Sequence, residues 1–340
     1  MKITILTINR FSNLKRSLFY IIKYFILFFQ RNYIFDIKSF LSFIKYDGHP
    51  QVIESLVNGL KLNKIEYNLN PKKLESIYPI VIVISGIEEL KKAIHLKKIE
   101  KIKKLIVGPT IAIQPSELGD LLESEQINLI VTASKWMVDF YILDMPSLKG
   151  KVLSWPSGTN LEYWINKNIS KKEYVLFYVK QHNIKEKFKI KIFTTFLKLR
   201  NIKFKIIYYG KYNNKIYRKY LHKSMFSIFF SMSESQGIAL LESWAAGCPT
   251  LVYYNDRVDY KHYPTRNCET APYLTNLTGK YFYSYRDFEQ KCNYFIKNYK
   301  NFNTSKWVSE NMTDKISASN LLKMITDTEL ITKSNRLNKN

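Results

Sequence analysis

The stretch that decides the fold is residues 231–254, which reads S-M-S-E-S-Q-G-I-A-L-L-E-S-W-A-A-G-C-P-T-L-V-Y-Y. An apolar run just before it, at 226–230, predicts a buried strand. After a polar loop that ends at Gly237, apolar residues recur every three or four positions, which predicts a helix. Gly247 and Pro249 stop this helix, since glycine adopts the left-handed conformation and proline cannot continue a helix. The final T-L-V-Y-Y predicts the next strand, so the stretch is a βαβ unit.

Two carboxylates flank the predicted start of this helix, Glu234 in the loop and Glu242 within the helix. Glu234 follows the carboxyl end of a strand, where open α/β sheets bind ligands, and Glu242 lies about 7.5 Å along the axis from Gly237. Unpaired N–H groups of Gly237, Ile238 and Ala239 open the helix and favour a phosphate. A phosphate between two carboxylates suits a sugar–diphosphate–nucleoside. The alternative is that Glu234 only caps the helix and Glu242 is a solvated helix residue.

The spacing Glu234-x7-Glu242, with Gly237 between and L-L-E-S-W-A-A-G-C-P-T following, resembles the signature of retaining GT-B glycosyltransferases of the family 4 type. In that family the first Glu contacts the transferred sugar, the second holds the ribose hydroxyls, and the amides after the glycine meet the diphosphate. The resemblance implies a catalytic role for Glu234 and donor-binding roles for Glu242, Gly237, Ile238 and Ala239. One departure is Gln236, where the family commonly has an aromatic residue.

Composition bounds the class of protein. The 340 residues are enough for two domains, and the 46% hydrophobic share excludes global disorder. The net charge of +25 comes mostly from lysine. It indicates either attraction to phosphorylated substrates or an acidic membrane, or a compositional drift that inflates Lys, Ile, Asn, Tyr and Phe together. Arginine clusters and nucleic-acid-reading motifs are absent, so no nucleic-acid partner is predicted.

The cysteines are Cys248, Cys268 and Cys292, an odd number without a C-x-x-C pair. This pattern predicts reduced thiols of a cytoplasmic protein rather than a disulfide framework or a metal site. No cleavable signal is visible. No metal or other cofactor is expected, in line with the resemblance, and the nucleotide-sugar would be a co-substrate.

The most apolar stretch is 17–30, S-L-F-Y-I-I-K-Y-F-I-L-F-F-Q, which is too short to span a bilayer. It predicts either an interfacial helix whose lysines meet acidic lipid at the inner face of the cell membrane, or an unusually apolar packed helix. The turn that follows contains Gly48 and His49. It resembles the loop that borders the acceptor site in the GT-B family, so both residues are weak candidates on the acceptor side.

Strands predicted at 78–85, 104–108 and 127–134 alternate with helices, and a second strand series begins at 174–179. This alternation indicates parallel sheets. With the resemblance, it predicts an α/β fold of two Rossmann-like doubly wound domains that face a central cleft. The predicted divisions are 1–157 for the acceptor domain, 158–325 for the nucleotide-sugar domain and 326–340 for a polar tail, with the last helix returning to the first domain.

Four further residues take their roles from the resemblance. The segment 153–164 is predicted to be the linker between the domains, and the family places this loop near the donor diphosphate, which implicates Gly158 and Asn160. Lys180 and Lys185 match a basic pair that neutralises the departing diphosphate. Lysine in place of the usual arginine loses the bidentate fork but keeps the charge. The connection from 210 to 226 has room for one helix only, which leaves the nucleobase pocket trimmed.

These features predict a retaining glycosyltransferase that moves a hexosyl group from a nucleotide-sugar to a saccharide or lipid-linked saccharide, in bacterial surface polysaccharide synthesis. Two alternatives stay open. A catalytically degenerate GT-B binding subunit would fit the trimmed second domain. A UDP-sugar epimerase of related fold would require further acid–base groups, which the sequence does not reveal.

Overall fold

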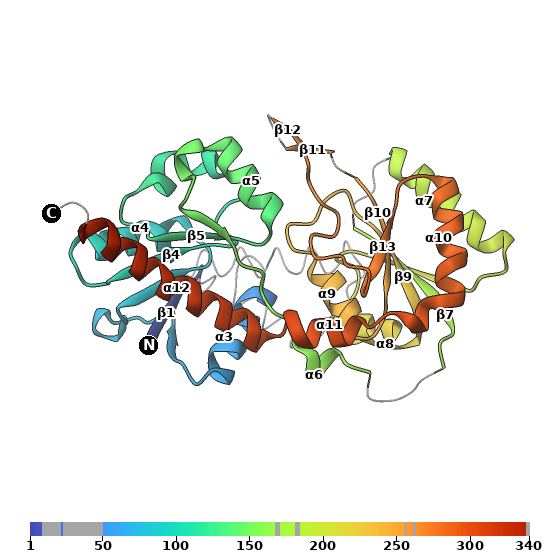
Figure 1. Cartoon of the computed structure of the whole chain (residues 1–340), viewed down its shortest axis with the longest axis horizontal. Coiled ribbons are helices and arrows are strands. Elements are labelled where there is room, and N and C mark those ends of the chain that lie inside the picture. The colour runs from blue at the N-terminus through green and yellow to red at the C-terminus, as the bar shows by residue number, and fades with distance from the viewer. Residues whose placement is uncertain are drawn as a thin grey trace. The chain divides into compact units, whose positions relative to one another are not determined.

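The computed structural model describes residues 1–8, 22, 50–166, 171–180, 184–255, 257–260 and 263–337. At 184–186, 257–260, 263–266 and 328–337 it describes the backbone only. The chain forms two compact units (Figure 1). Among the described residues, the first unit holds 1–8, 22, 50–158 and 314–337, and the second holds those between 159 and 313.

The first unit is built on a parallel sheet whose described strands follow the order β2-β1-β3-β4-β5-β6. Its central strands are almost wholly apolar, as is typical of strands covered on both faces. The strands are β1 (Lys2–Leu6), β2 (Glu66–Leu69), β3 (Ile80–Val83), β4 (Lys104–Val107), β5 (Leu129–Thr132) and β6 (Val152–Ser154). The helices are α3 (Pro50–Leu62), α4 (Ile87–Lys98), α5 (Lys135–Asp144) and α12 (Asp314–Leu337), with short 3-10 turns η1 (Leu74–Ser76), η2 (Pro115–Glu123) and η3 (Pro146–Leu148).

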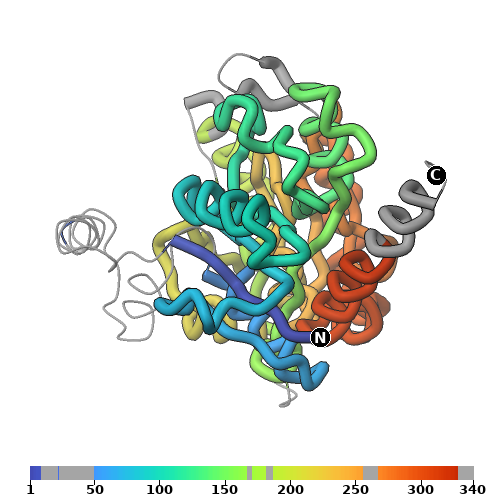
Figure 2. Tube along the Cα trace, turned by 90° about the vertical axis from the view of Figure 1, so that its left-hand side faces the viewer, coloured from blue at the N-terminus to red at the C-terminus, as the bar shows by residue number. Residues whose placement is uncertain are grey.

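Helix α12, orange to red in Figure 2, belongs to the first unit although it comes last in the chain. It packs closely on α3, because a Cβ built on Gly59 would lie 2.2 Å from the Asp314 carbonyl oxygen. Asn58 Nδ2 donates to Asp314 Oδ2 at 2.6 Å. Trp155 Nε1 donates to the Ser317 carbonyl at 2.9 Å in a buried contact. These contacts fasten α12 to the first unit.

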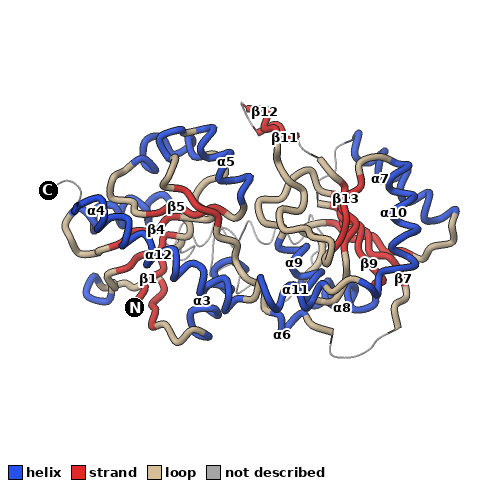
Figure 3. Tube along the Cα trace, in the orientation of Figure 1, coloured by secondary structure: helices blue, strands red, loops and turns tan. Residues whose placement is uncertain are grey.

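The second unit has a parallel sheet with the described order β13-β10-β9-β7-β8, whose strands converge in red in Figure 3. The strands are β7 (Tyr174–Val179), β8 (Phe204–Tyr208), β9 (Ser224–Phe230), β10 (Thr250–Tyr253) and β13 (Gly279–Phe282), with an antiparallel pair β11 (Arg257–Tyr260) and β12 (Tyr263–Arg266). The helices are α6 (Leu161–Trp164), α7 (Ile184–Leu199), α8 (Asn214–Lys223), α9 (Ile238–Ala245), α10 (Tyr285–Asn298) and α11 (Thr304–Asn311), with the 3-10 turn η4 (Tyr299–Asn301).

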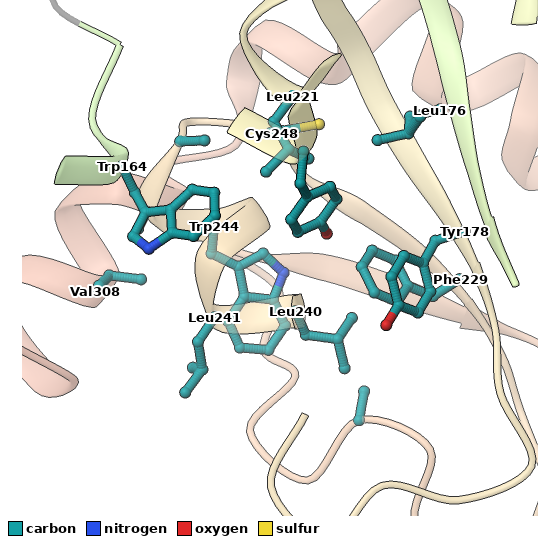
Figure 4. Packing of buried hydrophobic residues seen from close by; sticks show 14 of the residues in the cluster. Trp164, Leu176, Tyr178, Leu221, Phe229, Leu240, Leu241, Trp244, Cys248 and Val308 are labelled. Atoms are coloured by element: carbon teal, nitrogen blue, oxygen red, sulfur yellow. The ribbon is translucent and has the colours of Figure 1, made fainter. Parts of the chain in front are cut away.

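Both faces of this second sheet are covered, because successive side chains of a strand point to opposite faces. On one face, Tyr178 and Phe229 stack at 4.6 Å between ring centres and pack with Trp244 of α9 (Figure 4). Trp244 Nε1 donates to Thr250 Oγ1 at 2.9 Å, so its one polar atom is satisfied in the core. On the other face, Phe177 and its neighbours pack against the inner sides of α7 and α10.

The prediction of two doubly wound parallel-sheet domains is confirmed. Three details differ from the sequence interpretation. Val152–Ser154 pairs with β5 as an edge strand, so the predicted linker begins inside the first sheet. The last helix lies in the first unit as expected, so the numerical division, which had placed residues 314–325 in the second domain, ends too late. The antiparallel pair β11–β12 was not predicted from the sequence.

Candidate functional site

Strands β7 and β9 lie next to each other in the second sheet, and each is followed by a charged residue of the predicted site. The Lys180 N–H donates to the Phe230 carbonyl at 3.0 Å, so the residue after β7 sits at the end of β9. From β7 the chain continues to β8 on one side and then returns to β9 on the other. The strand order therefore reverses between β7 and β9. Open α/β sheets bind ligands at such a switch point.

Lys180 and Glu234 form an ion pair at this point, with Lys180 Nζ donating to Glu234 Oε2 at 2.6 Å. The Glu234 side chain is 8% exposed and the Lys180 side chain 24%. The Glu234 N–H donates to the Glu269 carbonyl at 2.8 Å, which fixes the loop. The Lys180 ammonium also lies 5.3 Å from the centre of the Tyr209 ring. Charge-assisted bonds in a partly desolvated place are strong, so both side chains are held in position.

Helix α9 begins next to this pair, at a glycine in the left-handed conformation. Gly237 has φ 79° and ψ 53°, and a Cβ there would lie 2.8 Å from Leu240 Cδ1. The N–H groups of Gly237, Ile238 and Ala239 have no backbone acceptor in the described part of the chain. The first turn of α9 carries no acidic residue. Unpaired donors and the helix dipole therefore leave this start suited to an external anion.

Glu242 lies on α9 among apolar neighbours and is 6% exposed. Burial raises the pKa of its carboxyl group to about 8, and within the described chain no ion pair offsets that burial. Of the tyrosines near it, Tyr217 is buried and Tyr212 is partly buried. Burial, reinforced by the negative charge of Glu242, raises the pKa of Tyr212 well above its usual value. A buried carboxyl group without a protein partner is a ready hydrogen-bonding site for ligand hydroxyls.

The geometry excludes the alternative that the sequence left open for the two carboxylates. The N-cap of α9 is Gly237, with no side-chain cap bond, so Glu234 is not a helix cap. Glu242 is buried, so it is not a solvated helix residue. The helix stop is as predicted: Gly247 has φ 74°, and the Cys248 N–H donates back to the Ser243 carbonyl at 3.0 Å.

The sequence matches no protein-family model and no curated protein sequence. Solved structures do match. The lipopolysaccharide outer core galactosyltransferase WaaB is 13% identical, with 96% of this chain and 99% of that chain covered and a TM-score of 0.52. Sucrose-phosphate synthase from Thermosynechococcus elongatus is 10% identical, with 97% and 100% covered and a TM-score of 0.52. The fold is that of the GT-B glycosyltransferases.

A third GT-B structure, the catalytic domain of starch synthase IV from Arabidopsis thaliana, is 10% identical over 84% of this chain and 79% of that chain, with a TM-score of 0.50. Three further matched chains are longer, and this protein spans only 54–57% of their length. Because every identity is low, the likeness establishes the GT-B fold, and the activity is argued separately below.

Some of the predicted site residues come together within the second unit. Lys180, Glu234 and the start of α9 meet at one sheet edge. Asn160 instead caps α6, with its Oδ1 accepting from the Tyr163 N–H at 3.0 Å, and Gly158 is the last residue of the first unit before the chain crosses. The Lys185 side chain, Gly48, His49 and all of 17–30 except Ile22 lie outside the described residues.

Sequence reasoning missed the tyrosines of this site. Tyr209 lies against Lys180, and Tyr212 donates to the Tyr178 hydroxyl at 3.2 Å. Tyr217 donates to the Ala239 carbonyl at 2.8 Å, which ties α8 to the first turn of α9. The signal was present in the run Y-Y-G-K-Y at 208–212, directly after a strand that neighbours β7.

The sequence also led to predictions about a metal site, the state of the cysteines and membrane spans. Among the described residues, no group of three or more His, Cys, Asp or Glu could hold a metal ion. The three cysteines are free and buried. In the described part of the chain, no helix has the length and apolar character needed to cross a membrane. The expectation that catalysis requires no metal stays a prediction.

Proposed function

We propose that this protein is a retaining glycosyltransferase of the GT-B family 4 type, which transfers a hexosyl group from a nucleotide-sugar to a saccharide acceptor. One observation carries the proposal. The switch point of the second sheet holds the Lys180–Glu234 pair directly beside a helix start that has unpaired N–H groups and no acid of its own. A diphosphate with a sugar on one side and a ribose on the other fits the ion pair, the unpaired N–H groups and the lack of an acid in the first turn.

The diphosphate would lie at the start of α9, where Gly237, Ile238 and Ala239 donate N–H groups. Lys180 would stabilise the charge that grows on the diphosphate as the bond to the anomeric carbon breaks. Because Lys180 and the helix start both supply positive potential, the transfer is proposed to proceed without a metal. The Lys185 role stays a prediction, as do the donor roles of Gly158 and Asn160.

Glu234 would orient the transferred sugar, since its carboxylate is held 2.6 Å from Lys180 and thus close to the leaving group. Glu242 would accept hydrogen bonds from the ribose hydroxyls, because the described part of the chain supplies no ion pair to its buried carboxyl group. The acceptor hydroxyl oxygen would then form the new glycosidic bond to the anomeric carbon as the bond from that carbon to the diphosphate oxygen breaks. The acceptor proton would pass to the departing diphosphate.

The structural neighbours support this substrate class. Starch synthase IV was solved bound to ADP and acarbose, a nucleoside diphosphate with an oligosaccharide-like ligand. WaaB is described as a galactosyltransferase of the lipopolysaccharide outer core. We therefore propose a saccharide or lipid-linked saccharide acceptor in surface polysaccharide synthesis, at the cytoplasmic face of the membrane. Membrane contact through residues 17–30, together with Gly48 and His49 at the acceptor side, belongs to the same proposal.

Calorimetry with UDP-, GDP- and ADP-sugars tests the function, with wild type beside Glu242→Ala and Glu242→Gln. One donor is expected to bind, and loss of the ribose contact should weaken it by at least roughly tenfold. Glu310→Ala is the matched control, because Glu310 is an exposed carboxylate of the same unit and should leave affinity unchanged. If no donor binds to the folded protein, the enzyme assignment fails and a binding subunit replaces it. Nuclear magnetic resonance of the product reports whether the anomeric configuration is retained.

A further inference from the structure

Helix α7 is apolar on two opposite sides. Its inner side, with Ile190, Phe193 and Leu197, packs into the core beneath the second sheet. Its outer side carries Phe188 and Ile192 one turn apart, with Leu199 on the same stripe two turns further on. A surface helix of a water-soluble domain normally has only one apolar side, with polar residues opposite.

The outer stripe is open to solvent. Phe188 is 66% exposed, Ile192 36% and Leu199 77%. The stripe continues onto α10, which lies beside α7 in Figure 1, because the Tyr285 ring is 42% exposed and its centre is 6.4 Å from that of Phe196 on α7. A contiguous exposed apolar stripe of this kind marks an interaction surface. These four exposed residues are called the α7 face.

Basic residues border the α7 face on both sides. Lys187, Lys191, Lys198 and Arg200 are all exposed, and no acidic residue occurs from 187 to 200, the part of this segment whose side chains are described. On α10, Asp287 pairs with Lys291 at 2.9 Å, whereas Glu289, which accepts from the Tyr285 hydroxyl at 3.4 Å, keeps its negative charge. The border that α7 supplies is therefore positive.

We propose that the α7 face docks the protein on a bilayer that contains acidic lipid. Apolar side chains in the centre and lysines at the border are the arrangement of an interfacial helix, in which long lysine stems let the charges reach the headgroups. The overall charge of +25 adds a long-range attraction to a negative leaflet. A second copy of this chain fits poorly, since it would bring two rows of like charge together. The proposal is independent of the transferase activity, because lipid binding needs no substrate.

Flotation with vesicles of phosphatidylcholine alone, and with phosphatidylglycerol added, tests the proposal on the full chain. Wild type should float only with the acidic vesicles. Replacing Phe188, Ile192 and Leu199 by Gln together should lower partitioning at least roughly tenfold. The matched control replaces Leu62, Leu74 and Leu143 by Gln, three exposed apolar residues of the first unit, and should float as wild type does. Because all six side chains are exposed, the thermal midpoint should be unchanged in both variants.

The charge contribution is measured separately. Lys187, Lys191 and Lys198 replaced by Gln should also reduce flotation, and the loss should shrink at high salt. Lys92, Lys98 and Lys101 replaced by Gln give the same change in net charge on exposed positions of the first unit, with little effect. A polarity-sensitive dye on Phe188→Cys should shift to the blue with acidic vesicles, whereas a dye on Leu277→Cys should not. The three native cysteines are buried and will not compete for the label.

Two results would overturn the proposal. If the Phe188/Ile192/Leu199 variant floats as well as wild type, lipid contact lies elsewhere, for example in residues 17–30. If wild type ignores acidic vesicles but forms a dimer, detected by light scattering, that the variant dissociates, the α7 face is a protein interface.

Discussion

At the switch point of the first sheet, β1 and β3 end in hydroxyls, with Thr7 Oγ1 and Ser85 Oγ 2.8 Å apart in a buried contact. At the equivalent point of the second sheet, β7 and β9 end in charges, with Lys180 and Glu234 2.6 Å apart. In each sheet the described strand order reverses at this place. The same topology thus carries a neutral pair in one unit and an ion pair in the other.

The helices that follow extend the comparison. Helix α4 begins at Gly86 with φ 102°, and α9 begins at Gly237 with φ 79°. The first turn of α4 carries two acids, Glu88 and Glu89, and Glu89 Oε2 lies 2.1 Å from where a Cβ on Gly86 would be. In α9 the first turn has no acid. In the first unit a carboxylate of α4 therefore lies at the positive end of its own helix. In the second unit the start of α9 has no such carboxylate and can bind an external anion.

This difference explains why only one of two similar sheets is assigned the donor diphosphate. Parallel topology supplies a switch point and a helix start in both units, and side-chain chemistry decides which becomes an anion site. The following predictions, in order of expected size, test that distinction.

Removing the ammonium at the second switch point should have the largest effect. Lys180→Met leaves the buried Glu234 carboxylate without its ion pair and removes positive charge from the leaving-group side. We expect transfer efficiency, kcat/KM, to fall about 10²–10³-fold with the donor that calorimetry identifies. Steady-state kinetics on the purified variant measures this.

The double variant Lys180→Met/Glu234→Gln separates stability from catalysis. It should recover much of the stability that Lys180→Met loses in urea unfolding, because Glu234→Gln removes the buried charge that the Lys180 ammonium balances. It should stay inactive. Recovery of turnover in the double variant would mean that the pair is only structural.

The second switch region should also make stability depend on pH, whereas the hydroxyls of the first do not titrate in this range. Burial raises the pKa of Glu242 from 4.5 to about 8. Between these values the folded protein binds the proton more tightly than the unfolded chain does, so the free energy of unfolding falls as pH rises. The loss should be roughly 2 kcal/mol between about pH 6 and about pH 8.

Urea unfolding of wild type and Glu242→Gln across this range measures the effect. The Gln variant should lack this part of the pH dependence, since its side chain does not titrate. Parallel curves for the two proteins would contradict a raised pKa at Glu242.

Glycine substitutions at the two helix starts should separate folding from binding. Gly237→Ala forces a Cβ into a left-handed residue and against Leu240, and should destabilise the protein by about 1–2 kcal/mol. Gly86→Ala meets a similar backbone penalty at φ 102°. Only Gly237→Ala should weaken donor binding in calorimetry. Equal losses of donor affinity would show that the helix start of α9 is not special.

The smallest effect is expected at the hydroxyl pair. Thr7→Val removes one partner of the Thr7–Ser85 contact and should lower stability by about 1 kcal/mol, because one buried hydroxyl loses a hydrogen bond. Donor affinity should be unchanged. A clear fall in donor affinity in Thr7→Val would place the donor at the first switch point instead.

Much of this architecture could be predicted from local patterns. Apolar runs such as Y-P-I-V-I-V-I-S and the glycine-terminated helix at 238–245 mark their elements directly. The strand β6 was missed because three residues inside a Pro- and Gly-punctuated segment carry no periodicity, and only pairing with β5 defines them. The return of the last helix to the first unit was predicted, but its packing on α3 was not, because it depends on the close approach at Gly59, which sequence spacing does not encode.

The sequence predicted the individual residues of the site but not the contacts between them. Lys180 and Glu234 each follow a strand, but their contact depends on β8 lying on the far side of β7. The burial of Glu242 could have been found, since the helix I-A-L-L-E-S-W-A is apolar on all sides and leaves no solvated face for a carboxylate. The tyrosines were missed because the run Y-Y-G-K-Y at 208–212 does not stand out in a chain with 25 tyrosines.

The packing of α12 on α3 sets an order of events during synthesis. Domains generally fold as units, with the N-terminal one first as the chain emerges from the ribosome. Here the strands of the first sheet emerge first, yet the helix that covers α3 is made only after residues 159–313 are complete. The second unit can therefore mature while the first still exposes the surface around Gly59. In the cell, the unit whose strands are made first would be the last to be protected from chaperones and proteases.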